Sequence, residues 1–212
     1  MQTLKKWQQT VKPLECLIVQ ATVKDGSSSW QPFPIGMGWQ FGLNYKVNTQ
    51  IGTHEKSVFC AIHPDTDQRR RRSYVVNRRK IIENLRKIGV QNVSLPHKDY
   101  FAQLPTYKFV ISPEGNGIDC HRHYEALLAG AIPIIERHPL TEEKYKGLPI
   151  LYTTDYSELT EDYLTNKYAE MLDVEYDFTK LSIKHYDTKT KEYIKECGNH
   201  WMLKHLGQKW YK

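Results

Sequence analysis

The residues best suited to chemistry lie between Ser112 and Glu125, in the segment SPEGNGIDCHRHYE. Arg122 and Glu125 are three residues apart, so on a helix their side chains share one face. A guanidinium in the first turn of that helix can bind a phosphate through paired hydrogen bonds. A carboxylate one turn later can accept hydrogen bonds from two ribose hydroxyls. The spacing suits a nucleotide diphosphate with its sugar, and the alternative is a surface pair without a ligand.

The loop before this predicted helix is rich in glycine. Gly115, Asn116 and Gly117 would let the backbone approach an anion, and the helix start would supply free N–H groups and a positive dipole end. Asp119 is predicted to cap the helix, and His121 to donate to a phosphate or a sugar hydroxyl. A short glycine loop before a helix is a weak signal, so a simple tight turn with a cap stays open.

Strands and helices alternate along the chain from Ser57 onward. Short apolar strands between amphipathic helices indicate an α/β fold, a Rossmann-like parallel sheet with helices on both faces. Ligands bind such sheets beyond the carboxyl ends of the strands, where the SPEGNGID loop is expected. The predicted strands are 57–62, 90–95, 107–113, 132–136 and 148–154, and the predicted helices are 73–89, 99–104, 121–130, 157–172 and one around 189–196.

Residues 1–56 differ from the rest of the chain in composition and in hydrophobic pattern. After a predicted strand at 14–21 they are rich in Gly, Pro, Ser and aromatic residues without a helical period. We therefore expect a small, loop-rich N-terminal lobe at 1–56 and a Rossmann-like domain at 57–212. The aromatic residues of the lobe either form its own core or offer a platform for an acceptor sugar; they are Trp30, Phe33, Trp39 and Phe41.

The positive charge of the chain is concentrated in one window. The 30 basic and 24 acidic residues give a formal charge of +6, but residues 69–80 (RRRRSYVVNRRK) hold seven basic residues and no acid. Everything outside this window is close to neutral. The window could bind a ligand's phosphates, form a solvated face, or track nucleic acid. Because Tyr74 is the only aromatic residue close to it, we do not expect nucleic acid as a partner.

Metal and membrane signals are weak. Asp65 and Asp67 form a D-x-D, a spacing that can hold a divalent ion, but the pair follows His63-Pro64 and is predicted to form a turn. We expect no metal requirement. No run of about 18 apolar residues exists, and the four cysteines are scattered, which predicts free thiols and a soluble, cytoplasmic protein without a membrane span.

The run SPEGNGIDCHRHYEALLAGAIPIIE resembles the donor-binding half of exostosin-like glycosyltransferases, which are of the GT-B type. The later run KYKGLPILYTTDYSELTED is similar to the next strand and helix of that family. The resemblance covers residues 105–165 well and 57–104 in outline. Members of this family also occur in large viruses and microbes that build their own glycans.

The resemblance implies a sugar transfer from a nucleotide-diphosphate sugar, with UDP favoured, to a glycan, a glycoprotein or another hydroxyl acceptor, with inversion. By the same resemblance Glu125 would hold the ribose, Arg122 the pyrophosphate, and the loop residues 115–117 the donor sugar. Arg78 or Arg79 would be a further phosphate contact. The donor is the only small molecule that this reaction requires.

A complete GT-B enzyme has two Rossmann-like domains, and 212 residues leave little room for the second. Either the N-terminal lobe replaces it, or the chain is one module of a larger polypeptide. A non-catalytic nucleotide-binding module and a basic nucleic-acid-binding α/β protein therefore stay as alternatives. The catalytic base would come from Glu114 or Asp119 in the loop, or from Asp25, His54, Glu55, Asp65 or Asp67.

Overall fold

The computed structural model describes residues 14–24, 30–44, 54–71 and 75–212, and it confirms the α/β class. Four parallel strands form one sheet in the order β1-β2-β3-β4. The strands are β1 (Lys56–Phe59), β2 (Tyr107–Ile111), β3 (Ile132–Glu136) and β4 (Leu151–Thr153). The helices are α2 (Trp39–Asn44), α3 (Arg78–Lys87), α4 (His97–Gln103), α5 (His121–Leu128), α6 (Pro139–Tyr145), α7 (Glu161–Leu172) and α8 (Thr188–Leu206).

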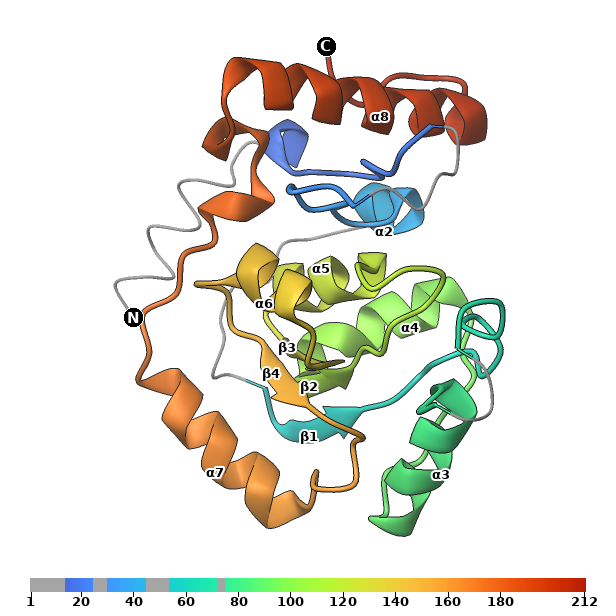
Figure 1. Cartoon of the computed structure of the whole chain (residues 1–212), viewed down its shortest axis with the longest axis vertical. Coiled ribbons are helices and arrows are strands. Elements are labelled where there is room, and N and C mark those ends of the chain that lie inside the picture. The colour runs from blue at the N-terminus through green and yellow to red at the C-terminus, as the bar shows by residue number, and fades with distance from the viewer. Residues whose placement is uncertain (1–13, 25–29, 45–53, 72–74) are drawn as a thin grey trace.

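Helices cover both faces of the sheet because alternate strand residues point to opposite sides. Phe109 and Ile111 of β2 pack into one buried cluster with α3 and α7. Val110, between them, belongs to a second cluster with α4, α5 and α6. Figure 1 shows the same layers, with α3 and α7 below the sheet and α4, α5 and α6 above it.

The chain leaves the ends of β1 and β2 in opposite directions. After β1 it enters α3 on one face, and after β2 it enters α5 on the other face. Where neighbouring connections diverge in this way, a crevice opens beyond the carboxyl ends of the strands. The fold therefore places its natural ligand crevice between the β1 and β2 ends.

Residues 14–24 and 30–44 form a further layer between α5 and α8, called the N-terminal layer below (Figure 1). Leu17, Val19, Phe33 and Phe41 are buried in the same cluster as residues of α8 and of the α5 face of the sheet. The division at residue 56 stays a prediction, since this core runs across it.

Two predicted strands are wrong, each for a local reason. At 14–21 the chain begins with a 3-10 turn (Leu14–Cys16), and Leu17 and Val19 make only isolated bridges to different partners. At 90–95 the Asn92 side chain bonds both the N–H and the C=O of Ile62 at 2.8 and 3.0 Å. Beside the backbone bond from Val93 N to Cys60 O at 2.9 Å, these side-chain bonds take the place of a regular strand pairing.

The helix boundaries also shift, while their order holds. The helix predicted at 73–89 begins at Arg78, because the Asn77 side chain accepts from the Lys80 N–H and caps it. The predicted ends at Gly89 and Gly130 are confirmed, and both glycines have positive φ. The last helix runs further than expected and ends at Gly207. No helix in the described part of the chain combines the length and apolar character needed to cross a bilayer.

The Tyr211 hydroxyl joins the two ends of the described chain, accepting from Val19 N and donating to Leu17 O, both at 2.9 Å. We predict that Tyr211→Phe lowers the free energy of unfolding by about 1–3 kcal/mol, because two buried backbone groups lose their partner. Urea titrations measure this. Tyr163→Phe is the control, since that hydroxyl has no hydrogen bond within the described residues, and an equal loss in both variants would contradict the assignment.

Candidate functional site

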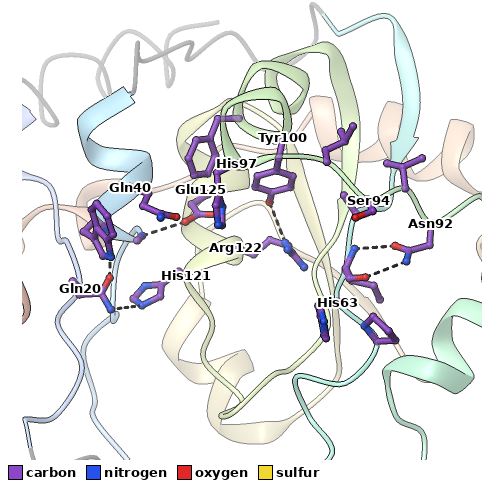
Figure 2. Close-up of a pocket in the computed structure, with 18 residues that line it drawn as sticks. Gln20, Gln40, His63, Asn92, Ser94, His97, Tyr100, His121, Arg122 and Glu125 are labelled. Carbon is purple, nitrogen blue, oxygen red and sulfur yellow. Dashed lines mark hydrogen bonds between the residues drawn. The ribbon is translucent and has the colours of Figure 1, made fainter. Parts of the chain in front are cut away.

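A cavity of about 560 Å³ opens beyond the carboxyl end of β1, next to the first turns of α5. Its walls come from five parts of the chain: the N-terminal layer, the segment after β1, the loop before α4, α4 itself, and the first turns of α5. Figure 2 shows the polar side chains that line it. Of the residues singled out from the sequence for ligand binding, the cavity brings together His121, Arg122 and Glu125.

The cap of α5 differs from the prediction. Cys120 occupies the N-cap position, and no side chain hydrogen-bonds the first turn. Asp119 is turned away because other groups hold its carboxylate more strongly than a helix N–H would. The start of α5 thus reaches the cavity without a side-chain cap.

Arg122 is a cation without an anionic partner in the described residues. Its Nε donates to the Tyr100 hydroxyl at 3.0 Å, and the guanidinium lies 5.2 Å from the centre of that ring. No carboxylate of the described residues lies within 4.0 Å of the guanidinium. The other guanidinium nitrogens are therefore available to a ligand.

Arg78 adds a second positive charge nearby. It is buried, and its guanidinium donates to three backbone carbonyls, those of Glu114, His63 and Pro113, at 2.8, 3.2 and 3.1 Å. Burial and the charge of Arg122 both lower the pKa of Arg78. Arg78 does not line the cavity, so its role in this geometry is to hold the loop after β2 and to contribute to the positive potential.

Glu125 lies one turn after Arg122 and faces the same cavity. Its Oε1 accepts from the Gly38 N–H at 3.2 Å. A Cβ at residue 38 would lie 2.9 Å from that oxygen, so a side chain there would have to displace the Glu125 carboxylate. Burial raises the pKa of Glu125, an effect that His121 and Arg122 partly offset. With one oxygen held by Gly38, the other can accept from a ligand hydroxyl.

His121 fastens the N-terminal layer to α5. Its Nδ1 is 2.8 Å from the Gly36 carbonyl and must donate, and its Nε2 accepts from the Gln20 amide at 2.9 Å. The Gln20 oxygen in turn accepts from Trp39 N at 3.2 Å. Both ring nitrogens are thus occupied, which differs from the expected contact with a phosphate or a sugar hydroxyl.

Asp119 belongs to a buried network away from the cavity. Its carboxylate accepts from Lys144 Nζ at 2.7 Å, from the Tyr124 and Tyr145 hydroxyls at 2.6 Å each, and from Ile35 N at 3.2 Å. Burial on its own would raise the pKa of Asp119, but the Lys144 charge and these donors bring it below its usual value. Asp119 therefore ties α5, α6 and the N-terminal layer together.

The glycine loop is held by arginines and lies outside the cavity. Glu114 is buried and pairs with Arg70, whose Nε also donates to Gly115 O at 3.3 Å. Asn116 is exposed and Gly117 half-buried. None of Glu114, Gly115, Asn116 and Gly117 lines the cavity, and their assignment to the base and the donor sugar stays a prediction.

Several arginines of the cationic window pair with acidic side chains. Arg71 pairs with Asp67 at 2.8 Å and with Glu136 at 2.6 Å. Arg79 is exposed, pairs with Asp65 at 2.8 Å and does not line the cavity. Arg72 lies outside the described residues. The segment thus serves largely to anchor the turn at 64–70 against the loop after β2.

The D-x-D forms part of this turn. The Asp67 carboxylate accepts from Arg71 and from the Arg78 N–H, while Asp65 faces Arg79. Within the described ranges no cluster of three His, Cys, Asp or Glu side chains could hold a metal ion.

The remaining candidates scatter. His54 is buried against the Gly130 carbonyl, Glu55 is exposed, and Asp25 lies outside the described residues. Phe33 and Phe41 belong to the core, whereas Trp39 lines the cavity. Trp30 is exposed, and Lys144 Nζ lies 4.0 Å from its ring centre.

Several cavity residues escaped the sequence analysis, among them Gln20, Gly38, His63, Asn92 and His97. Gly38 and Gln20 reach α5 from more than 80 residues away, and no local spacing signals such a contact. His63 carried a signal, since it directly follows a predicted strand and so lies at the carboxyl edge of the sheet.

The buried Asp119–Lys144 pair generates a pH-dependent prediction. We expect Lys144→Met to cost about 3–5 kcal/mol of unfolding free energy at pH 7, because it leaves a buried carboxylate unpaired. In the wild type the pair stabilises the fold above the unfolded pKa of about 3.9 and is lost as pH falls. Without Lys144 the folded pKa of Asp119 rises, so the destabilisation must shrink on acidification.

Urea titrations at pH 7 and pH 5 measure this difference. The control is Lys167→Met, which removes a lysine paired with Glu170 at the surface. It should change the free energy of unfolding by less than about 1 kcal/mol. Buried His123 also weakens the fold in acid, because burial lowers its pKa to about 4, an effect that the charge of Asp119 partly offsets. A Lys144→Met cost that grows as pH falls would contradict the account.

The comparisons add no family to this picture. The sequence matches no model of a known protein family, and no curated protein is significantly similar to it. What is established is an α/β fold with a parallel sheet and a cavity at its carboxyl edge, lined by Arg122 and Glu125.

Proposed function

We propose that the cavity binds a nucleoside diphosphate sugar and that the protein is a glycosyltransferase. The observation that carries the proposal is the charge of Arg122, which faces the cavity without a carboxylate partner in the described residues and shares a helical face with Glu125. An arginine left without an anion is a ready site for phosphate, which its planar group can bind through two parallel hydrogen bonds.

This arrangement indicates where the diphosphate and the ribose of the ligand bind. The diphosphate binds at Arg122, with the uncapped start of α5 and the buried charge of Arg78 adding positive potential. The ribose binds at Glu125, whose free oxygen accepts from its hydroxyls. Because Gly38 holds the other oxygen, the carboxylate is oriented before the ligand arrives.

The transferred sugar extends from the diphosphate toward the parts of the cavity formed after β1 and before α4. In the reaction the bond between its anomeric carbon and a phosphate oxygen breaks, and the acceptor oxygen forms the new bond while losing one proton. UDP is the favoured nucleotide on the family resemblance of residues 105–165. A glycan or glycoprotein hydroxyl is the acceptor class on the same ground.

A nucleic-acid function has less support. The basic window that suggested it is largely paired within the fold, by Asp65, Asp67, Glu114 and Glu136. These acids leave few of its charges free to release counterions from a nucleic acid.

Calorimetric titration with UDP tests the site. We expect micromolar binding by the wild type and a loss of about ten- to a hundredfold in Arg122→Met, because a charge-assisted hydrogen bond contributes about 1.5–3 kcal/mol. Glu125→Gln should weaken UDP and leave the affinity for 2′-deoxy-UDP closer to that of the wild type. The control is Arg86→Met, an exposed arginine on α3 that does not line the cavity.

Two results would overturn the proposal at different levels. Absence of UDP binding, with no other nucleoside diphosphate stabilising the protein, would remove the nucleotide site. UDP binding without release of UDP from any UDP-sugar and acceptor tried would favour the non-catalytic binding module.

A further inference from the structure

The cavity contains a histidine, His63, in which a backbone hydrogen bond determines which ring nitrogen carries the proton. His63 lies four residues after the end of β1 at Phe59, and its Nδ1 accepts from the Asp65 backbone N–H at 3.3 Å. A backbone N–H can only donate, so Nδ1 carries no proton in this arrangement. In the neutral ring the proton is then on Nε2, which becomes a hydrogen-bond donor.

The backbone of this histidine is fixed on both sides. Its carbonyl accepts from Arg78 at 3.2 Å, and the preceding Ile62 is held by the Asn92 side chain through two hydrogen bonds. The Nε2–H makes no hydrogen bond within the described residues, and the side chain is exposed toward the cavity. Because the backbone of His63 is held in place and its Nε2–H has no partner among the described residues, this N–H is suited to donate to a ligand.

The other cavity histidines lack one of these features. His121 uses both ring nitrogens to hold Gly36 and Gln20. His97 makes no hydrogen bond in the described part of the chain, so nothing there fixes its proton. In the view of Figure 2, His63 lies below the end of the Arg122 side chain, and both residues line the same cavity.

We infer that His63 donates its Nε2–H to an oxygen of the diphosphate that Arg122 binds. The inference rests on the proposed function and adds a residue from the segment after β1 to a site otherwise built on α5. When the bond between the anomeric carbon and the phosphate oxygen breaks, the electron pair stays on that oxygen. A hydrogen bond there strengthens as the charge develops, which stabilises the departing diphosphate. The proton of the acceptor hydroxyl leaves to solvent.

Two variants distinguish loss of the Nε2–H donor from loss of the hydrogen bond between Nδ1 and the Asp65 N–H. In His63→Asn the side-chain oxygen can still accept from the Asp65 N–H, but the side chain no longer reaches as far as Nε2. In His63→Gln the amide nitrogen stands close to the Nε2 position and restores the donor. Thermal unfolding checks that both variants fold as the wild type does.

The probes are UDP and uridine, titrated by calorimetry into the full chain. We expect UDP to bind about tenfold more weakly to His63→Asn, within about threefold of the wild type to His63→Gln, and uridine to bind all three proteins alike. Nitrogen NMR of the His63 ring should show a protonated Nε2 that shifts when UDP is added.

Each outcome bears on one claim. Equal UDP affinity in the wild type and His63→Asn, or an Nδ1-protonated ring, would overturn the role of His63 and leave the proposed function intact. No UDP binding by the wild type would overturn the proposed function, and the role of His63 would fall with it.

Discussion

The site depends on a seam of hydrogen bonds between residues 35–38 and the start of α5. Ile35 N, Gly36 O and Gly38 N bond in turn to Asp119, His121 and Glu125, which lie within six residues of each other along the chain. This seam closes one wall of the cavity, orients the Glu125 carboxylate and attaches the N-terminal layer to the sheet domain. A side chain at position 38 would have to displace the Glu125 carboxylate from this contact.

Charge is distributed unevenly around this seam. Buried carboxylates are paired within the protein: Asp119 with Lys144, and Glu136 with Arg71. Such pairs are costly to leave incomplete. Arg122 and Arg78 are the contrast, because within the described residues their guanidinium groups donate to neutral partners. The fold thus keeps positive charge uncompensated beside the one wall that also offers a carboxylate, and this combination favours a ligand with phosphates and hydroxyls.

The parts of the structure that depend on local sequence could be predicted. Strand β3 coincides with the predicted 132–136, because the buried run IPIIE follows a glycine with positive φ. The shared face of Arg122 and Glu125 followed from helical spacing alone. The partners of those residues could not be predicted, since Gly38 and Tyr100 meet α5 only after the chain has folded. The same limit applies to Asp119, which the sequence predicts as a helix cap. In the structure its carboxylate instead binds Lys144, 25 residues later in the chain.

The central claim is that a nucleoside diphosphate binds with its phosphates at Arg122 and its ribose at Glu125. A crystal structure of the full chain grown with UDP tests this most directly. The account predicts diphosphate density within hydrogen-bond distance of the Arg122 guanidinium and ribose hydroxyls beside the Glu125 carboxylate. UDP bound elsewhere, with Arg122 still contacting only Tyr100, would contradict it.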